Sequence, residues 1–119
     1  MTSRWWTVEV DAHDPAAQAR FWAGVLDWTI FYEADDEVVI TKDGKTWPGL
    51  VFSRVPGSKT VKNRLHLDLA PDDQDAEVER VVGLGARLID IGQGDVGWKV
   101  LADPEGNEFC ILSTREGGM

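Results

Sequence analysis

The order of apolar and polar residues predicts a strand and then a helix at the start of the chain. From Trp6 to Asp11 the two kinds alternate, which is the period of a strand with one buried face. Asp14 and Pro15 form a typical helix start, an N-cap residue followed by proline at the first helical position. Apolar residues then recur at helical spacing as far as Leu26. We therefore expect a strand followed by an amphipathic helix.

Three more strands are expected in the first half of the chain. Residues 28–33 are rich in β-forming side chains, and residues 37–41 form a short apolar run. A strong turn signal follows at Asp43-Gly44. Residues 50–55 are bounded on both sides by Pro-Gly pairs, which favours a fourth strand. The first half thus reads as βαβββ.

The second half repeats this order. Residues 64–69 alternate, with three leucines on one side, as in the opening strand. A helix capped by Asp72-Asp73 continues to about Leu84, and Gly85 ends it. Three short strands are expected over 86–91, 97–102 and 107–113, the last two joined by a tight turn at 103–106.

Two similar halves define the expected fold class, an α+β domain made of two βαβββ modules. A length of 119 residues fits a single domain. We place module one at about 4–56, a connection at about 57–62 and module two at about 63–115. A helix must cover one face of each set of strands, so we expect the polar rows to lie on the opposite faces and to line a cleft.

The chain resembles the glyoxalase-like domains of the vicinal oxygen chelate (VOC) superfamily, which include bleomycin resistance proteins and dioxygenases. The resemblance rests on the Phe21-Trp22 pair in the first helix, the run Asn63 to Asp68 and the run Asp103 to Phe109. It implies two modules whose mixed sheets curl around a common cavity, and it commonly implies a homodimer. The activities of the family range over lyases, isomerases, dioxygenases and antibiotic-sequestering proteins, so fold alone does not choose among them.

The resemblance also implies four metal-ligand positions, one each on the first and fourth strands of both modules. They fall on Thr7, on Phe52 or Ser53, on His66 and on Cys110. Only His66 is a usual ligand there, so we expect no catalytic metal and no other cofactor. The alternative is a divalent ion such as Zn, Ni, Fe or Mn, held by His66 together with Glu9, Glu108 or Cys110.

Three side chains are candidates for catalysis, namely His66, Glu9 and Glu108. On a polar strand face beside Asp68, His66 could act as a general base. The alternative is a hydrogen-bonded structural histidine. For the two glutamates the alternative is a solvated position or a salt bridge to Arg64 or Lys99.

Five residues are candidates for contact with a ligand. Six tryptophans are many for a chain of this size, and their rings can stack on a flat or cationic molecule. The alternative for the rings is core or interface packing, and for the cysteine it is a buried packing position. The candidates are Trp5, Trp47, Asp68, Trp98 and Cys110.

Charge and cysteine content limit the binding partners and the cellular compartment that we expect. A formal net charge of −9 argues against binding to nucleic acid, which draws on clustered Lys and Arg. We find no apolar stretch long enough for a signal peptide or a membrane span. A single cysteine excludes an internal disulfide and suits a reducing compartment. We therefore expect a cytoplasmic protein whose partners are a small molecule and a second copy of itself.

Two functions remain open at this stage. The first is a small-molecule-binding protein without a catalytic metal, holding an aromatic or cationic ligand in an acidic cavity lined by tryptophan. The second is a lyase or isomerase of the glyoxalase type that uses His66 and a carboxylate, with or without a divalent metal.

Overall fold

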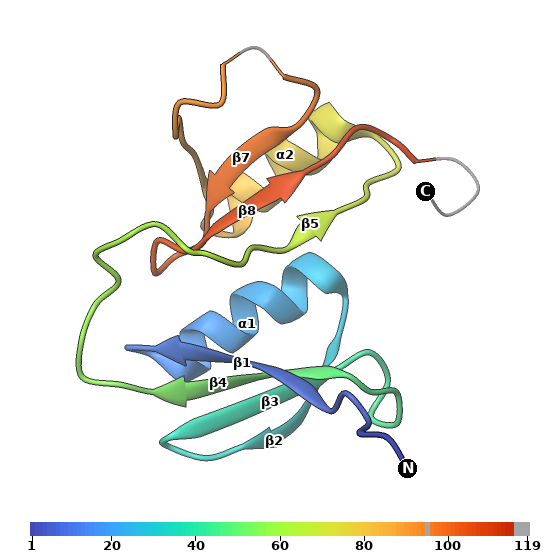
Figure 1. Cartoon of the computed structure of the whole chain (residues 1–119), viewed down its shortest axis with the longest axis vertical. Coiled ribbons are helices and arrows are strands. Elements are labelled where there is room, and N and C mark those ends of the chain that lie inside the picture. Colours follow the sequence, from blue (N-terminus) through green and yellow to red (C-terminus); the bar gives the residue numbers. More distant parts are fainter. Residues whose placement is uncertain (95, 116–119) are drawn as a thin grey trace. The chain divides into compact units, whose positions relative to one another are not determined.

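The computed structural model describes residues 1–94 and 96–115, and it divides the chain into two compact units between Ser58 and Lys59. Within these residues each unit contains one helix and a four-stranded mixed sheet (Figure 1). The predicted fold class, α+β with two βαβββ modules, is confirmed. The single domain with its module boundaries stays a prediction.

Unit 1 holds its strands in the order β1-β4-β3-β2. Strands β1 and β4 are parallel, and the other neighbours are antiparallel. This arrangement places the first and last strands of the module side by side, although residues 13–48 lie between them in the sequence. The elements are β1 (Thr7–Ala12), α1 (Pro15–Leu26), β2 (Thr29–Glu33), β3 (Glu37–Thr41) and β4 (Gly49–Arg54).

Helix α1 begins and ends where the sequence predicts. The Asp14 carboxylate caps it by accepting the Ala17 N–H at 3.2 Å, and Pro15 occupies the first turn. It ends at Asp27, whose φ of 56° is left-handed. The helix packs against β3 and β4 and forms the core of the unit with them. This core contains Ala19, Phe21, Trp22 and Val25 of the helix and Val38, Ile40, Leu50 and Phe52 of the sheet, all buried.

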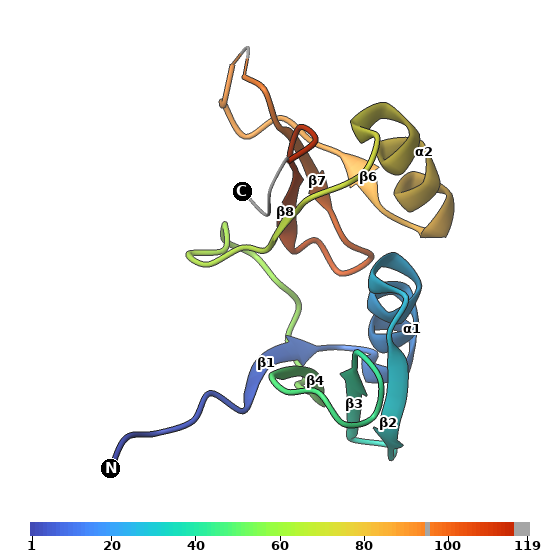
Figure 2. The ribbon, with the colours of Figure 1, turned by 90° about the vertical axis from the view of Figure 1, so that its right-hand side faces the viewer.

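Unit 2 repeats the arrangement with shorter strands, in the order β5-β8-β7-β6. Figure 2 shows α2 with β6, β7 and β8, and Figure 1 shows β5 beside β8. Again the first and last strands, β5 and β8, are parallel. Asp73 caps the helix by accepting the Ala76 N–H at 3.0 Å, and Gly85 ends it with a φ of 127° that favours glycine. The elements are β5 (Asp68–Leu69), α2 (Gln74–Leu84), β6 (Arg87–Leu88), β7 (Lys99–Ala102) and β8 (Glu108–Ile111).

All four strands of unit 2 are shorter than predicted, β7 and β8 by a few residues and β5 and β6 by most of their length. The strand expected over 64–69 forms only at Asp68–Leu69, and Leu65 is 89% exposed, so its row of leucines does not face the core as expected. The strand expected over 86–91 forms only at Arg87–Leu88. The Ile89 N–H still donates to the Val100 carbonyl of β7 at 3.0 Å, and after it the Asp90 carboxylate accepts the Gly92 N–H at 2.7 Å in a local turn.

Neither helix in the described part of the chain is long and apolar enough to cross a membrane.

Candidate functional site

Three side chains of unit 2 lie close together where the edge strand β5 pairs with β8, namely His66, Asp68 and Cys110. Asp68 of β5 pairs with Cys110 of β8 in the parallel ladder, and His66 lies two residues before Asp68. The His66 Nε2 atom is 3.1 Å from the Asp68 Oδ1 atom. One donor atom from each of the three residues lies within 4.8 Å of the other two. We call these residues the His-Asp-Cys triad.

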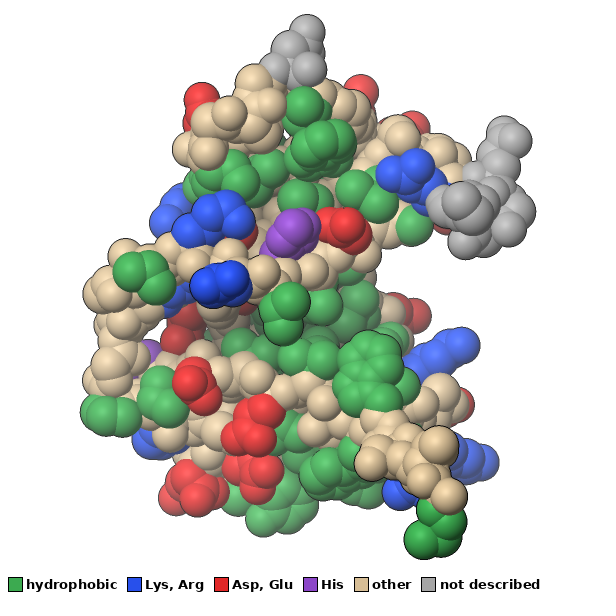
Figure 3. All heavy atoms as spheres, in the orientation of Figure 1, with side chains coloured by type: hydrophobic (Ala, Val, Ile, Leu, Met, Phe, Trp, Pro, Cys, Tyr) green, Lys and Arg blue, Asp and Glu red, His purple; other side chains and the backbone are tan. Residues whose placement is uncertain are grey.

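Two members of the triad are accessible and one is buried. The side chains of His66 and Asp68 are 40% and 50% exposed, whereas Cys110 is 6% exposed. Figure 3 shows a histidine and an acidic side chain adjacent on the surface of unit 2. A ligand from solvent can therefore reach the imidazole and the carboxylate, with the sulfur beneath them.

The Cys110 thiol is not an activated nucleophile. Burial raises the pKa of this thiol, and the negative charge of Asp68 and the hydrogen bond from the thiol to that carboxylate raise it further. The positive charge of Lys62 opposes these effects without reversing them. A nucleophilic cysteine needs a lowered pKa, so nucleophilic attack by this sulfur has no support.

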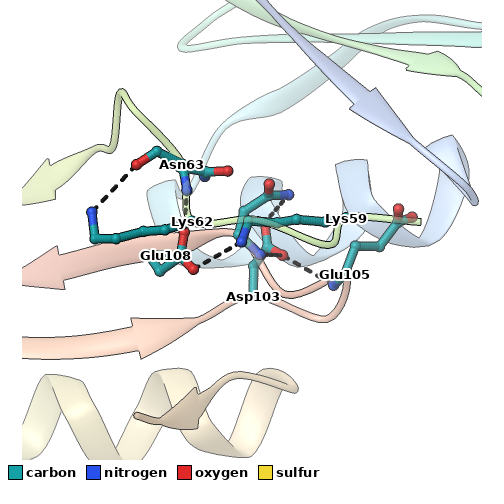
Figure 4. Close-up of polar contacts among 7 residues, drawn as sticks. Lys59, Lys62, Asn63, Asp103, Glu105 and Glu108 are labelled. Atoms are coloured by element: carbon teal, nitrogen blue, oxygen red, sulfur yellow. Dashed lines mark hydrogen bonds and ion pairs between the residues drawn. The ribbon is translucent and has the colours of Figure 1, made fainter. Parts of the chain in front are cut away.

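Glu108 lies outside the triad and forms a mostly buried ion pair. Its Oε2 is 2.8 Å from the Nζ of Lys59, and its Oε1 accepts the Asn63 backbone N–H at 2.8 Å (Figure 4). The side chains of Lys59 and Glu108 are 18% and 11% exposed. Burial raises the pKa of the Glu108 carboxyl, but the Lys59 and Asn63 hydrogen bonds outweigh it, so the net pKa is lowered.

The partner of Glu108 is therefore Lys59, and not Arg64 or Lys99 as the sequence suggested. Its two carboxylate oxygens hold the segment that enters β5 against β8. This is a structural role, and it supports the salt bridge that the sequence offered for Glu108 as an alternative to catalysis.

Unit 1 offers poor metal ligands at the positions that the family resemblance implies. Phe52 is a core residue with no exposed surface, and Thr7 supplies only a hydroxyl. The Ser53 hydroxyl donates a hydrogen bond to the exposed Glu9 carboxylate at 2.6 Å. Among the side chains at or next to these positions, only the Glu9 carboxylate is a strong oxygen donor for a metal ion.

Three aromatic side chains of unit 1 form a second feature, which we call the aromatic cluster: Trp6, Phe31 and Trp47. The ring of Trp47 lies 5.6 Å from that of Trp6 and 5.3 Å from that of Phe31, measured between centroids. Trp6 and Phe31 are 55% and 52% exposed, so the cluster presents aromatic surface to solvent. Sequence reasoning named Trp47 but missed its two neighbours.

The other two tryptophans named from the sequence lie outside the aromatic cluster. Trp5 is 66% exposed, and its indole N–H donates to the Thr7 carbonyl at 3.1 Å. Trp98 belongs to unit 2 and is 42% exposed. Both rings are accessible, which is compatible with contact to a ligand.

Comparison with protein families gives one match, to the family described as glyoxalase-like domain, over residues 7–112. A comparison with curated proteins found no match. Many solved structures share the fold, among them a glyoxalase/bleomycin resistance protein/dioxygenase family enzyme from Burkholderia phytofirmans PsJN. It is 20% identical, with a TM-score of 0.68, and the match covers 92% of this chain and 97% of that one.

Two further structures illustrate how varied the proteins with this fold are. The fosfomycin resistance protein FosX from Mesorhizobium loti is 18% identical with a TM-score of 0.68, over 99% of this chain and 97% of that one. The trypanothione-dependent glyoxalase I of Leishmania major is 12% identical with a TM-score of 0.67, over 94% and 87% of the two chains. At such identities the likeness establishes the fold and not the activity.

Proposed function

The chain belongs to the glyoxalase-like domain family of the VOC superfamily, and we propose that it binds a small aromatic or cationic molecule without using a catalytic metal. The observation that carries this proposal is the exposed aromatic cluster of unit 1. Soluble proteins seldom leave several large aromatic rings together at the surface without a binding role. The finding that Trp6 and Phe31 are each more than half exposed is the specific support.

The chemistry of the cluster favours a flat or positively charged ligand. An aromatic ring attracts a cation over its face, with a stabilisation of about 0.5 to 2 kcal/mol that grows as water is excluded. Stacking on a flat ring contributes about 0.5 to 1.5 kcal/mol. The formal net charge of −9 adds a long-range attraction for cations. Trp5 of unit 1 and Trp98 of unit 2 are both exposed, and each remains a proposed contact for a ligand bound at its own unit.

Binding of this kind needs no metal-assisted step. At the family's ligand positions unit 1 supplies a threonine hydroxyl and a buried phenylalanine, which supports a protein that keeps the fold and binds its ligand by stacking. Asp68, beside His66, remains a proposed polar contact for a ligand at unit 2.

The proposal is tested by titrating the protein with N-methylquinolinium, tetramethylammonium and neutral quinoline while following tryptophan fluorescence. We expect saturable binding, tightest for the flat cation. Replacing Trp6 by leucine removes one ring and should weaken binding about fivefold, the equivalent of about 1 kcal/mol.

A matched control is the change Tyr32→Leu, because Tyr32 is a similarly exposed ring (51%) outside the aromatic cluster. It should leave the affinity within about twofold of the original. Equal weakening by both changes, or no saturable response to any of the three probes, would contradict the proposal.

A second candidate function is favoured by the His66–Asp68 contact. We propose as this alternative a lyase or isomerase in which His66 moves a proton and Asp68, at 3.1 Å, orients the imidazole. Here Asp68 replaces Glu9 and Glu108 as the carboxylate partner. Turnover of a hemithioacetal that is lost in His66→Ala would support it, and turnover unchanged by that replacement would exclude it.

We further propose that the protein works in the cytoplasm as a homodimer, without nucleic-acid or membrane partners. The free, buried Cys110 supports the cytoplasm, and the net charge of −9 argues against nucleic acid as a partner. The homodimer is proposed from the family resemblance alone. Sedimentation of the purified protein should give twice the monomer mass.

A further inference from the structure

The aromatic cluster shares one face of the unit 1 sheet with the Glu9 carboxylate. We propose that the molecule bound at the aromatic cluster carries an ammonium group on a flexible chain, and that Glu9 binds this group. The inference rests on the function proposed above, because it names the chemical class of ligand for that same site. It adds a second point of contact and a required distance between the ring and the charge of the ligand.

The sheet of unit 1 has one face covered by α1 and one face turned away from it. The buried core residues of β3 and β4, such as Ile40 and Leu50, lie on the helix side. Successive residues of a strand alternate between the two faces, so the residues between these core positions lie on the other side. We call that side the open face. Along β3 and β4 it carries Val39, Thr41, Gly49, Val51 and Ser53.

Trp47 places the aromatic cluster at one end of the open face. Its ring lies so close to Gly49 that a Cβ added to this glycine would be 3.1 Å from the ring atom Cζ3. In the parallel β1–β4 ladder Gly49 is the partner of Thr7, the first residue of β1. The rings of Trp6 and Phe31 pack against that of Trp47. The cluster therefore lies at the end of the open face where β1 and β4 begin.

Glu9 lies further along the same face. It is the partner of Val51 in the β1–β4 ladder, so both side chains point to the open face. The Ser53 hydroxyl donates to the Glu9 Oε1 at 2.6 Å, which directs the carboxylate toward the far end of β4. Val51 and Ser53 follow Gly49 by one and two strand repeats. The carboxylate is therefore about 7 to 13 Å along the sheet from the contact of Trp47 with Gly49.

The charge of Glu9 is held in place but is not neutralised. The Ser53 hydroxyl is uncharged, and within the described part of the chain no ion pair to Glu9 is found. The next residue of β4, Arg54, donates instead to the main-chain carbonyls of His13 and Asp35. A carboxylate binds an ammonium group through charge-assisted hydrogen bonds. Because its side chain is exposed, Glu9 can receive that group from a ligand.

The surroundings of Glu9 strengthen the preference for a cation. Asp11 and Glu37 are the ladder partners of Ser53 on either side of β4, so they also lie on the open face. Figure 3 shows acidic and hydrophobic side chains beside one another on unit 1. The aromatic end suits a flat ring, and the acidic end attracts a positive charge and repels a negative one.

The distance between the two contacts sets the length of the ligand. A fully extended chain advances about 3.5 Å for every three bonds, so about 7 to 13 Å corresponds to roughly six to eleven bonds between ring and nitrogen. The charge of N-methylquinolinium lies in its ring and reaches only the aromatic cluster. We therefore expect an arylalkylammonium ion with a chain of this length to bind more tightly than N-methylquinolinium.

The test compares naphthylethylammonium, naphthylhexylammonium and naphthyloctylammonium with the corresponding neutral alcohols, by isothermal titration calorimetry of the full chain. The ratio of the alcohol Kd to the amine Kd isolates the effect of the charge, because each pair shares its ring and its chain. We expect a ratio of about five for the hexyl and octyl chains, as for a partly exposed ion pair. For the ethyl chain, which is too short to reach Glu9, the ratio should stay below about two.

The change Glu9→Gln should lower the hexyl ratio to that of the ethyl chain and leave the alcohol Kd within about twofold of the original. A matched control is Glu33→Gln, which removes the same charge from the same sheet. Glu33 pairs with Arg20 of α1 and is the ladder partner of the core residue Val38, so it lies on the helix side. This control should retain the hexyl ratio.

Circular dichroism checks the fold of each variant. If Glu9→Gln does not fold, the dependence on chain length in the unaltered protein still decides the question. No saturable binding of any probe would overturn the proposed function together with this inference. Binding in which the preference for the amine is equal for all three chains, or persists in Glu9→Gln, would overturn the inference alone.

Discussion

Replacing Glu108 by glutamine removes the charge that pairs with Lys59 but keeps an oxygen for the Asn63 N–H. An exposed ion pair contributes about 0 to 1 kcal/mol, and breaking a fully buried pair costs about 3 to 5 kcal/mol. With the two side chains 18% and 11% exposed, this pair lies between those limits. We expect Glu108→Gln to lower the free energy of unfolding at pH 7 by about 2 kcal/mol.

The effect should depend on pH in a defined direction. The folded-state pKa of Glu108 is lowered from 4.5, so its stabilisation is fully present above that value and is lost as the pH falls through the folded pKa. The difference in unfolding free energy between the original protein and Glu108→Gln should therefore be constant near neutral pH. It should shrink below pH 4.5 as the carboxyl becomes protonated in the folded state.

The assay is urea unfolding followed by circular dichroism, because Trp98 is the sole tryptophan of unit 2 and fluorescence would report mainly on unit 1. Hydrogen exchange at the Asn63 amide gives a local readout of the same contact. As a control, Glu77→Gln breaks the more exposed Glu77–Arg80 pair and should cost about 0.5 kcal/mol. Equal costs for the two changes, or a Glu108 effect that does not vary with pH, would refute the reasoning.

Two further predictions concern packing within single units. Val81→Ala, at a position with no exposed surface, should cost about 2 kcal/mol in urea unfolding, while Val82→Ala, 42% exposed, should cost less than about 0.5 kcal/mol. Gly49→Ala would place a Cβ 2.7 Å from the Ile40 carbonyl oxygen, so it should cost about 1 to 3 kcal/mol. Gly57→Ala meets nothing within 4 Å and should be close to neutral; similar results for the two glycines would contradict this account.

Local signals in the sequence were sufficient to predict the order of elements. Caps at Asp14 and Asp73 and the terminating Gly85 lie within a few residues of the helices that they bound. Their physical effect is local, so it can be read from the sequence. The ends of strands were less predictable. In unit 2, side-chain carboxylates accept backbone N–H groups before β5 and after β6, where a neighbouring strand was expected. Glu108 accepts the Asn63 N–H, and Asp90 accepts the Gly92 N–H.

The candidate sites depend on contacts between distant residues. Lys59 and Glu108 are 49 residues apart, and the pairing of Asp68 with Cys110 follows only once the β5–β8 register is known. The aromatic cluster likewise requires β2, the segment before β1 and the turn before β4 to come together (Figure 1). The sequence identified most of the side chains in these sites and placed His66 beside Asp68, but it did not predict the contacts of Lys59 with Glu108 or of Trp47 with Trp6 and Phe31.

The central claim is that the protein binds a flat or cationic small molecule without the help of a metal. The most direct measurement is equilibrium dialysis of the metal-stripped protein against N-methylquinolinium, repeated with Zn²⁺ present. We predict saturable binding with the same Kd in both conditions. Binding that appears only when Zn²⁺ is present, or that is absent in both conditions, would contradict the claim.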